Sequence, residues 1–209
     1  MGRYIGPACK QCRREGMKLF LKGPRCSMAK CPVETGRPAP GMHGMRRGRK
    51  QSDYGLQLRM KQRLRRQYGM QEGQFRLFFE RALRRKGVTG EALLQSLEAR
   101  LDNVVYRLGF AASRRAARQF VLHGHVLLNG VRADVPSMEV KPGSKVIVRS
   151  REISRELARR GMELSQGREV PVWLALDAGE FAGQYVRTPT RDEIAPIVDE
   201  QLVVELYSK

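Results

Sequence analysis

Apolar residues recur at helical spacing in the middle of the chain. Leu101, Val104, Val105 and Leu108 place an apolar stripe along one side of a helix. Gly109 follows them as a residue that commonly ends a helix. This pattern predicts a short helix with one face in a hydrophobic core.

A second helix is predicted directly after the first. Ser113 is placed to cap its N-terminus, and Gly124 suits the left-handed residue that ends it. Its predicted apolar stripe consists of Ala116, Ala117, Phe120 and Val121. Three basic residues fall off that stripe, so we expect them to face outward and to bind phosphate oxygens near the positive end of the helix dipole: Arg114, Arg115 and Arg118.

Short strands are predicted after these two helices. Residues 125–128 and 131–133 flank Asn129-Gly130, which favours a tight hairpin because both residues tolerate positive φ. Pro142-Gly143 indicates a second turn, which leads into a strand at residues 146–148. The predicted order of the central stretch is therefore helix, helix and three strands.

Three more helices are predicted on the N-terminal side. Ser52 caps a helix that runs to about residue 67 and carries a basic side of Arg59, Arg63 and Arg66. A second helix covers about residues 72–86, and Thr89 caps a third. The second helix has an aromatic stripe that we interpret as core, because its spacing is helical and continuous: Phe75, Phe78, Phe79, Ala82 and Leu83.

The C-terminal part combines a helix with a second hairpin. Residues 151–166 are predicted to be an amphipathic helix whose apolar side carries Ile153, Leu157 and Leu164. Residues 170–176 and 181–187 alternate around a turn at 177–180 and are expected to add two strands to the central sheet, with Trp173 as a packing anchor. The tail at 199–207 suits either a helix or a strand, and we predict a helix.

Basic charge is concentrated in the first part of the chain. The 209 residues contain 40 Lys and Arg against 21 Asp and Glu, a net charge of +19. Residues 1–98 hold 23 basic and 7 acidic side chains, whereas residues 151–209 hold 8 and 11. Solvation alone favours mixed signs, so this excess indicates a polyanionic partner, namely nucleic acid.

Membrane insertion is not expected. The sequence contains no run of about 18 apolar residues. Its polar N-terminus lacks the apolar region of a signal peptide. We therefore expect a cytoplasmic protein without a membrane partner.

All four cysteines lie in the first 31 residues, as Cys9-x2-Cys12 and Cys26-x4-Cys31. Two close pairs separated by a loop allow four thiolates to converge tetrahedrally, which is typical of a structural zinc site. Disulfides or free thiols are the alternatives without a metal, and an iron–sulfur cluster would use the same ligands. Metal binding would stabilise a segment that has too few apolar residues to fold alone.

The residues discussed so far closely resemble a known RNA-binding module, the S4 domain. The resemblance is carried by LDNVVYRLG at 101–109, Ser113-Arg114-Arg115, Arg118-Gln119, His123-Gly124-His125 and Asn129-Gly130. That module also occurs in other RNA-binding proteins, so the flanking sequence must decide between families. GRYIGP at 2–7, the first cysteine pair with Arg13-Arg14-Glu15-Gly16, and Lys18-Leu19 with Leu21-Lys22-Gly23 resemble the zinc-bearing form of the bacterial ribosomal protein S4 family.

The predicted fold class is α+β. Residues 1–45 are expected to form a metal-stapled cysteine segment and a basic linker, and residues 46–98 a helical domain. Residues 99–197 are expected to form the helix-helix-strand RNA-binding module, with a small, mostly antiparallel sheet. The resemblance implies that a C-terminal helix at about 198–209 folds back to complete the helical domain.

The resemblance implies a structural protein of the small ribosomal subunit that binds 16S ribosomal RNA. It further implies a role early in subunit assembly, a place at the messenger RNA entrance, the S5 family protein as a neighbour, and an influence on translational accuracy. The alternative is a free-standing RNA-binding regulator or recycling factor built on the same module. The residues expected to contact RNA are Arg3, Lys10, Arg13, Arg14, Lys22, Arg46, Arg47, Arg49, Lys50, Arg59, Arg63, Arg66, Ser113, Arg114, Arg115, Arg118, His123 and His125.

No catalytic activity is expected. Arg100-Leu101-Asp102 superficially matches the catalytic sequence of pseudouridine synthases, but it lies within the first helix of the module. Asp102 is therefore predicted to be structural. The sequence shows no phosphate-binding loop, nucleotide-binding glycine motif or Ser/His/Asp constellation, so a small-molecule substrate is not expected either.

Overall fold

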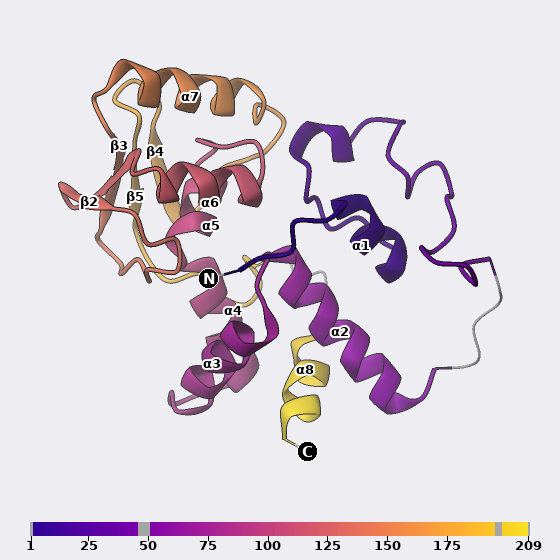
Figure 1. The fold of residues 1–209 in the computed structure, drawn as a ribbon. Helices are drawn as coiled ribbons and strands as arrows, with labels where there is room; N and C mark the ends of the chain where they lie inside the picture. Colours follow the sequence, from indigo (N-terminus) through magenta and orange to yellow (C-terminus); the bar gives the residue numbers. More distant parts are fainter. Residues whose placement is uncertain (1, 46–50, 195–197, 209) are drawn as a thin grey trace. The chain divides into compact units, whose positions relative to one another are not determined.

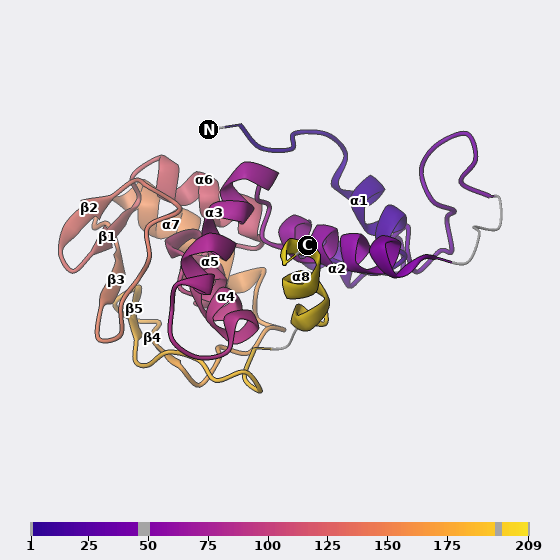
Figure 2. The ribbon, with the colours of Figure 1, turned by 90° about the horizontal axis from the view of Figure 1, so that it is seen from below.

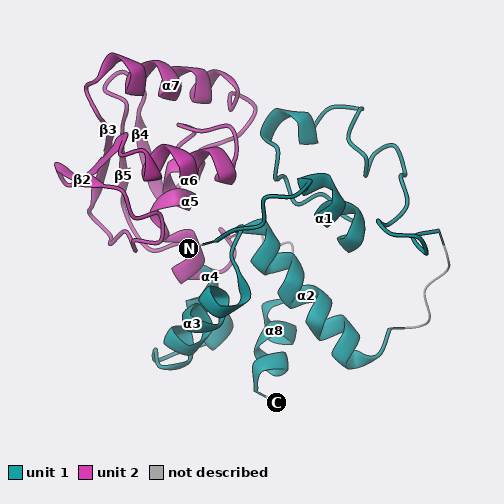
Figure 3. Ribbon diagram, in the orientation of Figure 1, with its two compact units in different colours: residues 1–94, 195–209 teal, residues 95–194 magenta. Residues whose placement is uncertain are grey.

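The computed structural model describes residues 2–45, 51–194 and 198–208. The chain divides into two compact units, which Figure 3 distinguishes by colour. Unit 1 comprises residues 1–94 and 195–209, and unit 2 comprises residues 95–194. In the described residues, helices and one antiparallel sheet together give the α+β class that the sequence predicts.

Within its described residues, unit 1 is built from helices. They are α1 (Ala8–Glu15), the 3-10 helix η1 (Gly23–Cys26), α2 (Asp53–Gln67), α3 (Glu72–Leu83), α4 (Thr89–Glu98), whose last residues belong to unit 2, and α8 (Glu200–Tyr207). The predicted cap of α2 is confirmed, because the Ser52 hydroxyl accepts a hydrogen bond from the Gly55 N–H at 3.2 Å.

The C-terminal helix α8 packs against α2, as both Figure 1 and Figure 2 show. Asp199 caps its first turn by accepting the Gln201 N–H at 3.0 Å. The Tyr207 ring stacks on Phe79 with centroids 4.6 Å apart, and its hydroxyl donates to Glu72 at 2.7 Å. The prediction of a helix for this ambiguous tail is therefore confirmed.

The aromatic stripe of α3 lies in the core of unit 1, as predicted, with one exception. Phe75, Phe78, Phe79 and Ala82 are buried, but Leu83 is 58% exposed because the helix ends there, three residues earlier than expected. Gly87 then turns the chain with a φ of 108°.

Unit 2 places three helices around one sheet. The helices are α5 (Leu101–Arg107), α6 (Arg114–Leu122) and α7 (Glu152–Glu163), and the strands are β1 (Val126–Leu128), β2 (Val131–Ala133), β3 (Lys145–Val148), β4 (Leu174–Asp177) and β5 (Ala182–Tyr185). The strand order is β2-β1-β3-β5-β4, and every neighbouring pair is antiparallel. The expected extension of the sheet by the second hairpin is thus confirmed.

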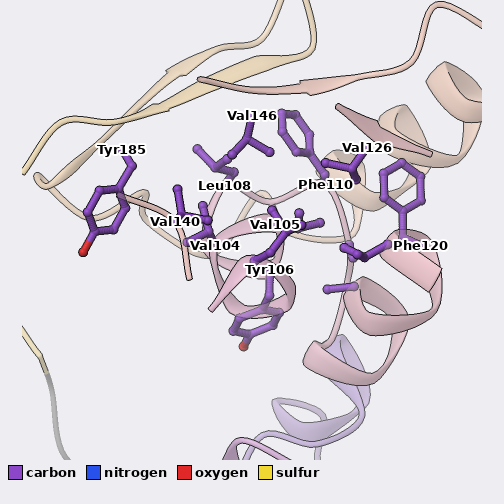
Figure 4. Close-up of a cluster of buried hydrophobic side chains, with 14 of the residues drawn as sticks. Val104, Val105, Tyr106, Leu108, Phe110, Phe120, Val126, Val140, Val146 and Tyr185 are labelled. Carbon is purple, nitrogen blue, oxygen red and sulfur yellow. The ribbon is translucent and has the colours of Figure 1, made fainter. Parts of the chain in front are cut away.

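The core of unit 2 lies between the sheet and its helices. Figure 4 shows Leu108, which follows α5, beside Val146 of β3, and Val104 of α5 beside Val140, all within one cluster of buried residues. The Asn129-Gly130 turn has φ angles of 50° and 83°, which is the geometry that tightens the β1–β2 hairpin. Trp173 is 1% exposed and meets Tyr185 edge to face, so the prediction of a packing anchor is confirmed.

The predicted apolar face of α6 is confirmed except at one residue, and the predicted apolar face of α7 is wrong. Ala116 in α6 is exposed, and the buried side of that helix consists of Ala117, Phe120 and Val121. In α7 the predicted apolar residues Ile153, Leu157 and Leu164 are exposed, whereas its buried face consists of small residues: Ser154, Ala158 and Gly161. Small residues face inward because the helix lies against backbone: a Cβ on Gly161 would meet the Phe110 carbonyl oxygen at 2.2 Å.

Candidate nucleic-acid interface

The four cysteines line a single pocket next to α1 and η1. Three of them, Cys12, Cys26 and Cys31, are buried, and all four are free thiols, so the structure forms no disulfide there. The backbone N–H of Lys22 donates to the Cys26 sulfur at 3.3 Å, a bond that favours a thiolate.

The pocket contains side chains of the type that bind zinc, but their sulfur atoms are not arranged in a metal-binding geometry. Burial raises the pKa of the Cys12 and Cys26 thiols, and backbone hydrogen bonds from Leu19 and Lys22 oppose that shift only in part. Among the described residues, no group of three or more His, Cys, Asp or Glu side chains could hold a metal ion. The zinc site therefore stays a prediction.

Two basic residues of the N-terminal segment bind the backbone of the linker instead of pointing into solvent. Arg13 donates to the Pro38 carbonyl at 2.9 Å, and Arg14 donates to the Pro40 carbonyl at 3.0 Å. Lys10 and Lys22 are exposed, and Arg3 is half-buried. The remaining predicted contacts of the linker lie outside the described residues: Arg46, Arg47, Arg49 and Lys50.

The basic side of α2 converges on one carboxylate. Glu15, the last residue of α1, has a fully buried side chain. Its Oε1 lies 3.2 Å from Arg59 Nη1 and also pairs with Arg66 Nη1, and its Oε2 lies 3.6 Å from Arg63 Nε. Arg63 also donates to the Glu15 carbonyl at 3.2 Å. The three arginines are 20% to 26% exposed, so this side of α2 is half-buried rather than solvated.

An open hollow of about 380 Å³ lies beside this cluster. It is lined by Arg14, Gln51, Arg59 and Arg66. Burial is the main cause that lowers the pKa of Arg66. The Glu15 carboxylate raises this pKa, and the neighbouring cations Arg59, Arg65 and Arg14 lower it. The hollow therefore concentrates positive charge and hydrogen-bond donors.

Unit 2 holds a second ionic network where α4 meets α5 and α6. The fully buried Glu98 carboxylate accepts from Arg107 at 2.7 and 2.9 Å and from the Asn103 side chain at 2.7 Å. Arg114 donates to the Asn103 side-chain oxygen at 2.8 Å, and its guanidinium lies 4.6 Å from the centre of the Tyr106 ring.

Asp102 joins two arginines in the same network. Arg100 donates to both of its carboxylate oxygens, at 3.1 and 3.0 Å, and Arg118 donates to one of them at 3.3 Å. The structural role predicted for Asp102 is therefore confirmed.

This network corrects the expectation that three arginines of α6 face outward. The side chains of Arg114 and Arg118 are only 12% and 14% exposed, because acidic groups of α4 and α5 face the start of α6. Arg115 is exposed as predicted. Ser113 caps the helix, accepting the Ala116 N–H at 3.2 Å.

The two histidines lie at the corner between α6 and β1. His123 is exposed, and its ring centre is 6.0 Å from that of His125. His125 Nδ1 lies 2.9 Å from the Ser154 hydroxyl. Burial lowers the pKa of His125, and the positive charges of His123, Arg149 and Arg151 lower it further. The positive charge at this corner therefore comes from Arg149 and Arg151, while the lowered pKa favours neutral His125.

Sequence reasoning missed the carboxylates that organise these surfaces. Glu15 and Glu98 are two of only seven acidic residues in the first 98, and an isolated acid within a basic stretch was the available signal. Arg168 was also missed: it stacks on Tyr106 with its guanidinium 3.8 Å from the ring centre, and it donates to the carbonyls of Tyr106 and Ala111.

Comparison with known proteins finds matches along nearly the whole chain. The model described as ribosomal protein S4/S9 N-terminal domain matches residues 3–98, and the S4 domain model matches residues 99–146. The chain is 54% identical to the small ribosomal subunit protein uS4 of Thermus thermophilus over 209 residues, which is 100% of both chains. It is 56% identical to the uS4 protein of Natranaerobius thermophilus and 53% identical to that of Acidithiobacillus ferrooxidans, again over the full length of each. Within the described residues, no helix has both the length and the apolar character needed to cross a membrane.

Proposed function

Because the chain belongs to the uS4 family, we propose that it is a structural constituent of the small ribosomal subunit and that it binds 16S ribosomal RNA in the cytoplasm. The observation that carries this conclusion is full-length similarity at more than half identity, which covers the helical segment as well as the S4 domain. Membership of this family also means that the chain is not an enzyme.

The geometry supports binding to the RNA backbone rather than to base edges. Arginines held by buried carboxylates in both units present fixed guanidinium groups, as at Glu15 and Glu98. Rigid donors of this kind match phosphate positions and the shape of folded RNA. Exposed cations such as Arg115 and Lys10 add to the attraction.

Sedimentation tests the assignment. In a gradient of cell extract, the protein should migrate with small ribosomal subunits in a one-to-one ratio. A free-standing regulator or recycling factor would instead remain near the top or bind substoichiometrically. The match of residues 3–98 to a ribosomal family model favours the first outcome, because that segment lies outside the S4 domain.

The family also suggests a more specific place in the ribosome. The chain would bind early during assembly of the subunit, lie beside the S5 family protein and the messenger RNA entrance, and influence translational accuracy. Reconstitution of subunits without this chain should then stall before the late proteins join. Normal assembly without it would contradict the early role.

A single zinc ion would hold the N-terminal segment together. Cys9, Cys12, Cys26 and Cys31 share one pocket, and a tetrahedral thiolate site would stabilise this small segment by about 10 kcal/mol. Elemental analysis of protein purified under reducing conditions should find about one zinc per chain. Iron with sulfide would indicate a cluster instead, and two disulfides without metal would contradict the proposal.

A further inference from the structure

We propose that Glu15 is a positioning residue, which holds Arg59 and Arg66 as one wall of a binding site for a single backbone phosphate of RNA. The site is the hollow lined by Arg14, Gln51, Arg59 and Arg66. This inference rests on the proposed RNA-binding function and adds the location of one phosphate site and the group that shapes it.

The charges around Glu15 do not balance. One carboxylate meets the guanidinium groups of Arg59, Arg63 and Arg66, which leaves an excess of positive charge before Arg14 is included. Glu15 is fully buried, whereas the arginines keep 20% to 26% of their side chains exposed. An anion arriving from solvent can therefore reach the arginines but not the carboxylate.

The contacts leave donors available on the side of the hollow. Arg59 and Arg66 each bind Glu15 through Nη1, and a guanidinium carries five N–H donors in a planar fork. Arg14, which also lines the hollow, is held by one hydrogen bond from its Nη2 to the Pro40 carbonyl. Forks of this kind bind phosphate oxygens in pairs, which a lysine cannot do.

Removing the Glu15 carboxylate distinguishes positioning of the arginines from attraction by net charge. Glu15→Gln makes the protein more basic, so attraction between net charges alone predicts equal or tighter binding to RNA. If Glu15 positions the arginines, the same change should weaken binding to a 16S rRNA transcript roughly tenfold, since hydrogen bonds of fixed charged groups are lost.

The matched control is Glu80→Gln. Glu80 pairs with Arg76 at 3.1 Å on the surface of α3, and both side chains are more than 40% exposed. This variant also removes one negative charge from unit 1, but it frees an arginine that already reaches solvent. Its affinity for the transcript should equal or slightly exceed that of the unchanged protein.

A second pair of variants decides the question if Glu15→Gln weakens the fold. Arg59→Ala removes one of the two arginines of that wall while Arg63 and Arg66 stay paired with Glu15, and Arg76→Ala removes an equal charge elsewhere. Arg59→Ala should weaken binding roughly tenfold and reduce the salt slope by about 0.7 to 0.9, the value for one lost phosphate contact. Arg76→Ala should change neither by more than a small factor.

The outcomes separate this inference from the proposed function. If the unchanged protein binds the transcript but Arg59→Ala behaves like Arg76→Ala, the hollow is not a phosphate site. If Glu15→Gln folds and binds as tightly as Glu80→Gln, Glu15 does not position the arginines. Failure of the unchanged protein to bind 16S rRNA would overturn the proposed function, and this inference with it.

Discussion

At the scale of single residues, buried carboxylates decide which arginines can reach a ligand. Glu15, Glu98 and Asp102 each bind two or more arginines, and their side chains are at most 8% exposed. A buried charge pair of this kind is costly to break, because either partner left alone remains desolvated. The number of arginines in a sequence therefore overstates the number of outward-facing cations.

Arg118 and Arg115 should respond differently to the same substitution. Arg118→Ala removes a donor from the buried Asp102, so we expect the free energy of unfolding to fall by about 1 to 3 kcal/mol. Arg115 is exposed, so Arg115→Ala should change stability by less than about 0.5 kcal/mol and weaken binding to 16S rRNA about fivefold. Urea titration and filter binding of both variants test this. Equal loss of stability in both would show that Arg115 serves the fold.

Protonation of His125 should destabilise the folded chain in weak acid. Its pKa in the folded state lies below the ordinary value of 6.5, so the unfolded chain binds more protons in this range. The free energy of unfolding should therefore be unaffected above about pH 6.5 and fall as the pH is lowered through the folded pKa. Urea titrations between pH 7.5 and 5 measure this.

The matched variants are His125→Gln and His43→Gln. The first should reduce the loss of stability below pH 6.5, whereas the second, at an exposed histidine, should leave it in place. An unchanged pH profile in His125→Gln would assign the effect to other groups.

At the scale of elements, α7 shows how a neighbour can override an amphipathic pattern. Its sequence places Ile153 and Leu157 on one side, yet the helix turns its small residues inward. Ala158 and Gly161 allow the helix to approach the backbone near Phe110. Larger side chains on that face would hold it away, so close approach, rather than apolar area, selects the buried face.

Gly161→Ala should reverse the usual benefit of replacing a glycine within a helix. The added Cβ would meet the Phe110 carbonyl oxygen at 2.2 Å, so we expect a loss of about 1 to 3 kcal/mol in the free energy of unfolding. Gly73 in α3 has no atom within 4 Å of an added Cβ, and Gly73→Ala should stabilise by about 0.5 to 1 kcal/mol. Urea titration of both variants measures the difference. A stabilised Gly161→Ala would show that α7 does not approach the backbone this closely.

At the scale of the whole molecule, net charge and charge placement have different consequences. The chain carries a net charge of +19, which attracts RNA over long distances. Its ionic networks in both units then fix a smaller set of cations at definite positions. Long-range attraction therefore governs encounter, and fixed arginines govern the docked arrangement.

Affinity for 16S rRNA should fall steeply with salt. Each neutralised phosphate makes the slope of log affinity against log salt more negative by about 0.7 to 0.9. Six contacts would therefore give a slope of about −5. Filter binding at several potassium chloride concentrations measures the slope. An affinity independent of salt would mean that the proposed phosphate contacts are absent.

The sequence by itself determined the local structure of this protein. The Ser52 and Ser113 caps, the Asn129-Gly130 hairpin and the aromatic stripe of α3 follow from residues near one another in the chain. Backbone hydrogen bonding and helical spacing act over a few positions, so pattern reading recovers them. The charge excess likewise indicated a nucleic-acid partner without any structure.

Only the tertiary structure decided which charged and apolar faces are available. Glu15 lies 44 to 51 residues before its three arginines, and no periodicity along the chain links them. A helical projection of α6 predicts that Arg114 and Arg118 are exposed. In the folded chain they are mostly buried, because acidic residues of neighbouring helices face them. The inward face of α7 likewise depends on the backbone at Phe110, because long-range approach and desolvation act between segments that sequence patterns treat separately.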